Sequence, residues 1–317
     1  MQRILLLLTL CAVGATLTLA QRTGIAAAAP AQYRLQATYR AGIAQNYSIT
    51  EVTNAVRTHS DGSKKEYSRT MTYMMTVRCL ESLDGTATLA VNIDSLKYAF
   101  LAEGGQINYD SQTEVTPKHF GDLNNYMGPM NRTFEITVGP YGEITKLAGE
   151  QVDYWRTYLK ESASSMDSVT SLIWNQSLDP ENLLHFGDLQ KRVVPGLRVY
   201  IDSAYAHQFT LRNDGVVYTG PVKSKLVDYT SGFYTISTKD TIRATPQPLH
   251  VYGVPYISQL TDGRAVVDHT VTITSQGTIN AISSKVDAWF RAAAQSEVYT
   301  QAVTSTTEWK LVGQYQW

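Results

Sequence analysis

The sequence predicts a mainly β protein of antiparallel strands in two related halves, forming a curved sheet, a sandwich or a half-barrel, with a helical connector. Three observations support this class. Apolar residues recur at every second position over long stretches, and Gly-containing turn signals separate these stretches. The 317 residues include 20 Tyr, a residue that favours the half-buried surface of a sheet.

The first 31 residues predict a secretory signal peptide followed by a short mature tail. Arg3 provides a positive start, Ile4–Ala20 is apolar and uncharged, and small residues follow up to Ala31. We expect the mature chain to begin between Gln21 and Gln32. An uncleaved membrane anchor is the alternative, because a 17-residue run lies at the lower limit for a spanning helix. With cleavage, the protein is exported (periplasmic, cell-envelope or secreted) and keeps no transmembrane segment.

Residues 32–148 are predicted to be a first β-rich half. Alternation over Tyr33–Arg40 indicates a strand, and a longer one follows the turn signal Asp61-Gly62. After the turn signal Asp84-Gly85, apolar residues recur with period two up to Ile93. Their parity then changes after Ser95, which predicts a β-bulge.

Cys79 lies on the apolar face of the longer strand, with Tyr67, Met71, Tyr73, Met75 and Val77. The alternatives for this thiol are a nucleophile, an intermolecular disulfide or a small buried apolar residue. Strand alternation favours the buried residue. Since Cys11 is removed with the signal peptide, no disulfide within the mature chain is expected.

Residues 149–186 are predicted to be a helical connector between this half and a second β-rich half, residues 187–317. Val152, Trp155, Tyr158 and Leu159 have helical spacing, and Asp179-Pro180 is typical of a helix start. In the second half, turn signals occur at Asp214-Gly215, Ser231-Gly232, Asp262-Gly263 and Gln276-Gly277, as at Tyr141-Gly142 in the first.

The two halves share a short pattern at an offset of 135 residues. Phe134, Ile136, Val138, Gly142, Ile144 and Leu147 correspond to His269, Val271, Ile273, Gly277, Ile279 and Ile282. The pattern suggests a duplicated hairpin, although unrelated β-hairpins also resemble one another. The offset also aligns Tyr154-Trp155, which we expect in a helix, with Trp289-Phe290, which we expect in a strand.

Several short motifs run along residues 33–310: Gly42, Asp84-Gly85, Tyr109-Asp110-Ser111, Gly142 and Pro195-Gly196. Together they resemble an uncharacterised family of exported bacterial β-rich proteins, a domain of unknown function. The chain departs from that family at 197–199, where a tryptophan often follows the glycine. The resemblance implies export and a two-part β architecture. It implies no activity, because the family has no established catalytic residues.

The charge balance gives no reason to expect a nucleic-acid partner. Lys and Arg total 27 against 28 Asp and Glu, and the longest basic run is Lys64-Lys65. The sequence also lacks the common phosphate-loop, dinucleotide, zinc-protease and serine-hydrolase motifs, and no cofactor is predicted.

One pentapeptide occurs twice, as His119-Phe120-Gly121-Asp122-Leu123 and again from His185 to Leu189. If the loops converged, the imidazoles of His119 and His185 and the carboxylates of Asp122 and Asp188 could bind a metal ion. The alternative is a pair of Gly-Asp turns, each held by a buried phenylalanine. The spacing of histidine and aspartate matches no recognised metal motif, which favours the turns.

Two further histidines are interpreted structurally. His269 lies on an apolar strand face between Val267 and Val271, which indicates a buried, hydrogen-bonded residue. His59, beside Asp61-Gly62, is interpreted as a solvated turn residue.

Three functional hypotheses follow from the sequence. The first is an exported, non-catalytic protein that binds an apolar or partly apolar small molecule or a lipid at the envelope or outside the cell. The second is a structural module with a filled core that interacts with another protein, such as an envelope protein. The third is a metal-dependent hydrolase that uses the two His-Phe-Gly-Asp loops.

Overall fold

The computed structural model describes residues 31–114, 123, 126, 130, 132–140, 143–162, 165, 171, 183–184, 197–254, 256–294 and 297–317. The chain divides into two units, Met1–Gln32 and Tyr33–Trp317, and all elements below belong to the second. The predicted signal sequence therefore lies outside the described residues. Within the described part of the chain, no helix is both long enough and apolar enough to span a membrane.

The predicted fold class is confirmed, because the second unit consists mainly of antiparallel strands with one helix among its named elements. The strands are β1 (Tyr33–Leu35), β2 (Ile43–His59), β3 (Lys64–Leu83), β4 (Thr86–Ala102), β5 (Gly105–Asp110), β6 (Phe134–Val138), β7 (Ile144–Ala148), β8 (Leu197–Val199), β9 (Ala204–Asn213), β10 (Val216–Thr230), β11 (Phe233–Ala244), β12 (Pro248–Leu249), β13 (Ser258–Thr274), β14 (Ile279–Ala294) and β15 (Glu297–Gln316). The helix is α3 (Glu150–Ser162).

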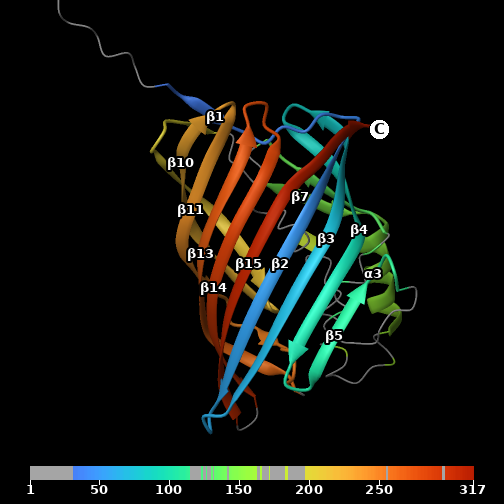
Figure 1. Ribbon diagram of the computed structural model, residues 1–317, viewed down its shortest axis with the longest axis vertical. Coiled ribbons are helices and arrows are strands. Elements are labelled where there is room, and N and C mark those ends of the chain that lie inside the picture. Colours follow the sequence, from blue (N-terminus) through green and yellow to red (C-terminus); the bar gives the residue numbers. More distant parts are fainter. Residues whose placement is uncertain are drawn as a thin grey trace, which may run out of the picture. The chain divides into compact units, whose positions relative to one another are not determined.

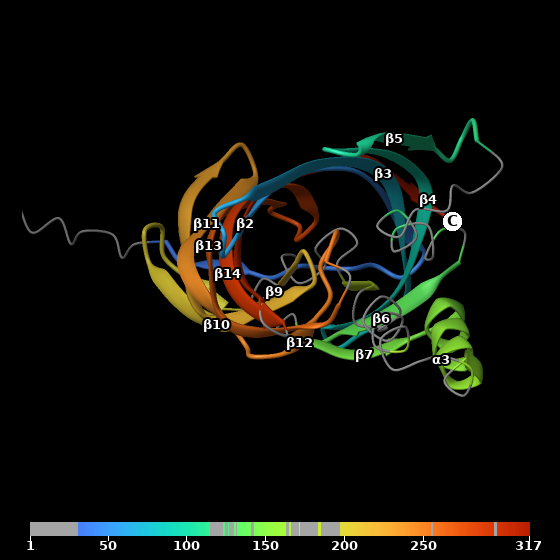
Figure 2. The same cartoon turned by 90° about the horizontal axis from the view of Figure 1, so that it is seen from below.

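Thirteen strands form one sheet, in the order β7-β6-β4-β3-β2-β15-β14-β13-β11-β10-β9, with β5 added to β4 and β12 to β13. Figure 1 shows the long central strands running side by side. Figure 2 shows that this sheet curls, with β3 and β4 on one side of an interior and β10 and β11 on the other. We call the concave side of the sheet the inner face.

The two β-rich segments of the sequence meet at the pairing of β2 with β15. These strands are antiparallel from Tyr299 opposite His59 to Gln316 opposite Ile43. A ladder of this length satisfies backbone groups of both strands, and it joins the strands from β2 to β7 and those from β9 to β15 into one continuous sheet, whereas β1 and β8 form a separate pair.

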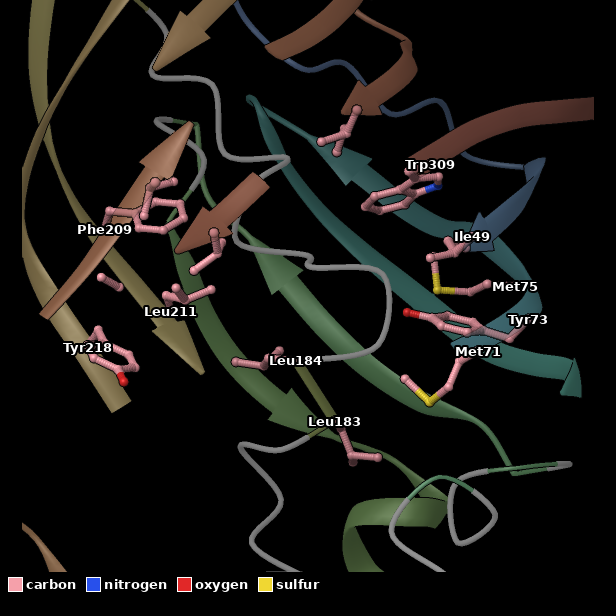
Figure 3. Packing of buried hydrophobic residues seen from close by; sticks show 14 of the residues in the cluster. Ile49, Met71, Tyr73, Met75, Leu183, Leu184, Phe209, Leu211, Tyr218 and Trp309 are labelled. Atoms are coloured by element: carbon pink, nitrogen blue, oxygen red, sulfur yellow. The ribbon is translucent and has the colours of Figure 1, made fainter. Parts of the chain in front are cut away.

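Side-chain alternation places the apolar residues of each strand on the inner face. The predicted apolar positions of β3 are confirmed, since Tyr67, Met71, Tyr73, Met75, Val77 and Cys79 are all buried. Buried residues from the whole sheet form one hydrophobic cluster. Figure 3 shows Trp309, Ile49, Tyr73 and Met75 on one side of the interior, Phe209, Leu211 and Tyr218 on the other, and Leu183 and Leu184 between them.

The bulge predicted after Ser95 is confirmed. Met74 pairs with Ser95 and Met75 pairs with Ile93, so Asp94 has no partner in the ladder and the parity of β4 reverses. The turn predicted at Asp262-Gly263 is wrong. These residues lie inside β13, where the register with β14 shifts between Leu260 and Asp262.

The packing around Gly263 explains why a glycine stands there although the chain does not turn. A Cβ atom at this position would lie only 2.9 Å from the Cβ of Ala244 and 3.1 Å from that of Phe290. Glycine is therefore required for close packing of the strands at a bulge, rather than for a reversal of the chain.

Three other turn signals are confirmed as hairpin turns, at Asp84-Gly85, Asp214-Gly215 and Ser231-Gly232. In each pair both residues have positive φ, for example 51° and 81° at Asp214-Gly215. Gln276-Gly277 joins β13 to β14, also as predicted. Tyr141-Gly142 lies outside the described residues.

The strand predicted for Tyr33–Arg40 is confirmed only for β1, which pairs with β8. Beyond β1, the backbone N–H of Thr38 donates to the carbonyl oxygen of Gly277 at 2.9 Å. The N–H of Gly42 then donates to the carbonyl oxygen of Cys79 at 3.0 Å. This segment therefore crosses one end of the curled sheet, as Figure 2 shows, and does not extend a ladder.

The helix predicted at the start of the connector is confirmed as α3. Val152 and Trp155 are buried, and Glu150 and Asp153 in the first turn have the charge that the helix dipole favours there. The rest of the connector falls largely outside the described residues. The 135-residue pattern holds over the β6–β7 and β13–β14 hairpins but not beyond them, because Trp155 is helical and Phe290 lies in β14. Duplication therefore remains a prediction.

Candidate functional site

The inner face differs in polarity along the lengths of β2, β3 and β15. Towards the β3–β4 turn its residues are mostly large and apolar. This apolar half consists of Tyr47, Ile49, Tyr73, Met75, Val77, Ile282 and Trp309, all buried, together with one buried polar residue, Gln45, which accepts a hydrogen bond from the phenol of Tyr47. Towards the opposite end, these strands place Thr53, Arg57, Arg69 and Gln301 on the same face. Burial of polar side chains on a concave face costs free energy unless they have hydrogen-bond partners.

A row of polar residues crosses the inner face and, on β2 and β15, lies at the boundary between these halves. Each member lies directly opposite the next on the neighbouring strand, from β10 to β2. The polar row consists of Ser224, Thr238, His269, Ser284, Thr307 and Glu51, all buried. Directly opposed residues of a sheet point to the same face, so the row extends over six adjacent strands.

One end of the polar row is internally satisfied. The hydroxyl groups of Ser224 and Thr238 are 2.5 Å apart, and Nε2 of His207 lies 2.8 Å from the Ser224 hydroxyl. Burial lowers the pKa of His207, which favours the neutral imidazole that such a neutral network accommodates.

The middle of the polar row is different. Ser284 is 4% exposed, and its hydroxyl has no hydrogen-bond partner among the described residues. On β14 the inner-face residues on either side of it are Ile282 and Val286, both buried and apolar. A buried hydroxyl without a partner costs about 1–3 kcal/mol, so the fold alone gives no reason for a serine here.

At the other end of the row, the phenol of Tyr73 donates to Oε1 of Glu51 at 3.2 Å. Thr307 lies between Glu51 and Ser284 in the ladder. The row therefore presents two hydroxyl groups, a carboxylate and an imidazole within a mostly apolar surface.

A second polar group, the Asp214 cluster, consists of Asp214, Gln301, Tyr67 and Arg57. Asp214 lies at the tip of the β9–β10 hairpin, and its Oδ2 accepts from Tyr67 at 2.5 Å and from the amide of Gln301. Nε and Nη2 of Arg57 donate to Oε1 of Gln301 at 3.0 and 2.8 Å. Nη2 also donates to the carbonyl oxygen of Tyr252 at 2.6 Å.

The Asp214 cluster attaches the hairpin tip to the inner face of the central strands. Next to it, the side-chain amide of Asn213 donates to the Ser305 hydroxyl at 3.1 Å. The guanidinium of Arg57 also lies 5.3 Å from the ring centre of Tyr299. Each residue of the Asp214 cluster therefore hydrogen-bonds to another, which is the usual condition for burying charge in a protein.

The interpretation of His59 as a solvated turn residue is wrong. Nδ1 of His59 contacts Glu297, which also accepts from the phenol of Tyr256. The hydrogen bond from Tyr256, followed by that from His59, lowers the pKa of Glu297 below its ordinary value of 4.5. No local sequence pattern predicts this contact, since Glu297 is 238 residues from His59.

The predicted burial of Cys79 and His269 is confirmed, and the hydrogen bond expected for His269 stays a prediction. Cys79 is a free, buried thiol whose pKa burial raises to about 11, so it is a poor nucleophile. His269 is buried in the polar row, with its ring 5.4 Å from that of Phe209.

The metal-site candidates His119, Asp122, His185 and Asp188 lie outside the described residues, so that hypothesis stays a prediction. Among the residues that are described, no group of three or more His, Cys, Asp or Glu side chains could hold a metal ion.

No family model and no curated protein sequence matches the chain. Among solved structures, one of lipovitellin, titled for its lipid–protein interactions, is 10% identical, with a TM-score of 0.43. The match covers 88% of this chain but only 26% of the lipovitellin chain, so this chain spans about a quarter of that protein.

Other matches are weaker. DynF, from the dynemicin biosynthesis pathway of Micromonospora chersina, is 6% identical with a TM-score of 0.23, over 90% of each chain. The β domain of the Bordetella autotransporter BrkA is 11% identical with a TM-score of 0.21, over 84% of this chain and 99% of that one. At these TM-scores the resemblances give no basis for assigning function.

Proposed function

We propose that this chain is an exported, non-catalytic β protein that binds an apolar or partly apolar ligand, such as a lipid, against the inner face of its sheet. The observation behind this proposal is the inner face itself. It is concave, its apolar half is lined by large side chains, and it includes a buried serine without a hydrogen-bond partner among the described residues. Curved antiparallel sheets commonly enclose ligands on such faces.

Export is the second part of the proposal and rests on the sequence. Arg3, the apolar Ile4–Ala20 and the small residues up to Ala31 have the pattern of a signal peptide. The resemblance to an exported bacterial family of unknown function agrees with it. N-terminal sequencing of the exported product should find a start between Gln21 and Gln32. Met1 retained on membrane-bound protein would show an anchor instead.

A structural or protein-interaction module is the second candidate. It is favoured by the fact that buried residues from both sides of the curled sheet, together with Leu183 and Leu184, belong to one hydrophobic cluster. A core packed to normal density leaves no space for a ligand. The two candidates differ in whether the purified protein takes up an apolar molecule.

The proposed function can be tested with N-phenyl-1-naphthylamine, an uncharged apolar dye that fluoresces in dry sites. Delipidated protein should bind it saturably, and a ligand that binds only the folded state should raise the melting temperature. Ile49→Trp, which fills the apolar half, should weaken binding at least tenfold. Thr50→Trp, the neighbouring residue on the other face, is the matched control and should not.

Folding of both variants is checked by circular dichroism, with Ile49→Phe as the milder replacement if Ile49→Trp fails to fold. Absence of saturable binding, or equal binding by the Ile49 and Thr50 variants, would contradict a ligand on the inner face and favour the structural candidate.

A further inference from the structure

The position of the polar row on the inner face indicates which kind of ligand that face would bind. On β2 and β15 it lies between the apolar half and the polar residues Thr53 and Gln301, whereas on β14 buried apolar residues lie on both sides of it. Such a boundary matches the boundary between the tail and the polar group of an amphiphile.

Building on the proposed function, we infer that Ser284 and Thr307 bind the polar group of an uncharged, single-chain amphiphile, such as a monoacylglycerol or a long-chain alcohol. Its alkyl chain lies along the apolar half. The two hydroxyl groups come from directly opposed residues of β14 and β15 and so point to the same face as neighbours. Each hydroxyl can both donate and accept, as recognition of an alcohol or ester requires.

Ser284 provides the observation that points to a ligand. It is more than nine-tenths buried, its hydroxyl lacks a partner among the described residues, and its neighbours Ile282 and Val286 are apolar. The satisfied pair Ser224 and Thr238, in the same row, shows that the fold can pair hydroxyl groups at this level. A ligand hydroxyl or carbonyl at Ser284 would supply the missing hydrogen bond.

The size of the apolar half fits an alkyl chain. From Glu51, in the row, to Ile43, at the start of β2, there are eight residues, or about 26 Å at roughly 3.3 Å per residue. On this side of the row, Ile282 and Trp309 are opposed inner-face residues, as are Ile49 and Tyr73. These side chains are apolar or aromatic and suit a hydrocarbon chain.

The charges in the row favour an uncharged polar group. Thr307 lies directly opposite Glu51, whose carboxylate is an acceptor when ionised. An anionic group at Ser284 and Thr307 would therefore lie near a carboxylate, whereas an alcohol or ester would not be repelled. The guanidinium of Arg57 is already bonded to Gln301 and Tyr252 at the far end.

The test compares three probes of equal chain length: monolaurin, lauric acid at pH 8, and dodecane. Each is delivered from cyclodextrin to the delipidated mature protein, and its dissociation constant is measured by equilibrium partitioning. Wild-type protein should bind monolaurin on the order of tenfold more tightly than either of the others. Ser284→Ala and Thr307→Val should each remove about 3- to 10-fold of that preference, as expected for a hydrogen bond between uncharged groups.

Ser283→Ala is the matched control. Ser283 is the neighbouring serine on β14, points to the other face and bonds to Glu308 at 2.6 Å, so its replacement should leave the preference unchanged. Equal affinity for the three probes, or a preference that survives Ser284→Ala and Thr307→Val, would overturn the inference and leave the proposed function standing. If no probe bound at all, both would fail.

Discussion

The polar row and the Asp214 cluster lie on the same inner face and are both buried, but they use their polar atoms differently. In the cluster, Asp214, Gln301, Tyr67 and Arg57 bond to one another, and they hold the β9–β10 hairpin against the central strands. In the middle of the row, the Ser284 hydroxyl contacts no partner among the described residues. The comparison separates buried polar residues that hold the fold together from a buried hydroxyl that does not.

This difference determines how mutations should change the free energy of unfolding. Removing a member of a satisfied network leaves its partners buried and unpaired, which is destabilising. Removing a polar atom that has no partner relieves its own desolvation cost. Mutations in the Asp214 cluster and at Ser284 should therefore change the free energy of unfolding in opposite directions.

The largest effect is expected in the Asp214 cluster. Gln301→Leu removes the amide that accepts from Arg57 and donates to Asp214, and so leaves a buried guanidinium with fewer partners. We expect a loss of about 3–5 kcal/mol in the free energy of unfolding, measured by urea denaturation. Thr306→Ala, on the exposed face of the same strand, should cost less than about 0.5 kcal/mol. Equal effects would mean that the cluster has no structural role.

A smaller loss is expected at the satisfied end of the polar row. Thr238→Val keeps the shape of the side chain but removes the hydroxyl that lies 2.5 Å from that of Ser224. The variant should lose about 1–2 kcal/mol, since the buried hydroxyl of Ser224 loses one of its partners. A neutral or stabilising result would remove the distinction between this end of the row and its middle.

The sign should reverse at Ser284. Without ligand, Ser284→Ala should raise the free energy of unfolding by about 1 kcal/mol, because it removes a buried hydroxyl without a partner. The same urea denaturation experiment measures it, with Ser283→Ala as the reference. A loss of more than about 1 kcal/mol would show that the fold uses this hydroxyl.

The smallest effect concerns Glu297, which is partly exposed. Its pKa is lowered in the folded protein by Tyr256 and then by His59, so its contribution to stability is present above the ordinary pKa and is lost as the pH falls through the lowered one. Glu297→Gln should therefore be slightly less stable than wild type at pH 7. The two melting temperatures should converge as the pH falls below 4.5, and a difference that stayed constant would exclude this carboxylate as its cause.

Much of the sheet could be predicted because strand alternation and turn chemistry are local. The face from Tyr67 to Cys79, the bulge at Ser95 and the turn at Asp214-Gly215 all follow from residues close together in the sequence. Asp262-Gly263 was misread because a glycine needed for packing against Ala244 looks the same in the sequence as one needed for a turn.

The site itself was largely missed, and for a physical reason. β2 was not predicted, because its inner face includes Gln45, Glu51, Thr53 and Arg57 among the apolar residues, and these interrupt the apolar alternation. Gln301 and Thr307 do the same in β15. The polar residues that distinguish the inner face are therefore the same residues that prevent its strands from being recognised in the sequence. Of the polar row, only His269 was recognised as lying on an apolar strand face, because it lies between Val267 and Val271.

The most direct test of the central claim, that the inner face holds an amphiphilic ligand, is native mass spectrometry of the mature protein purified under non-denaturing conditions. We predict a folded species heavier than the chain by one uncharged amphiphile, and a smaller bound fraction for Ser284→Ala than for Ser283→Ala. A wild-type protein that shows only the mass of its chain, and that gains no mass when incubated with monolaurin, would contradict the claim.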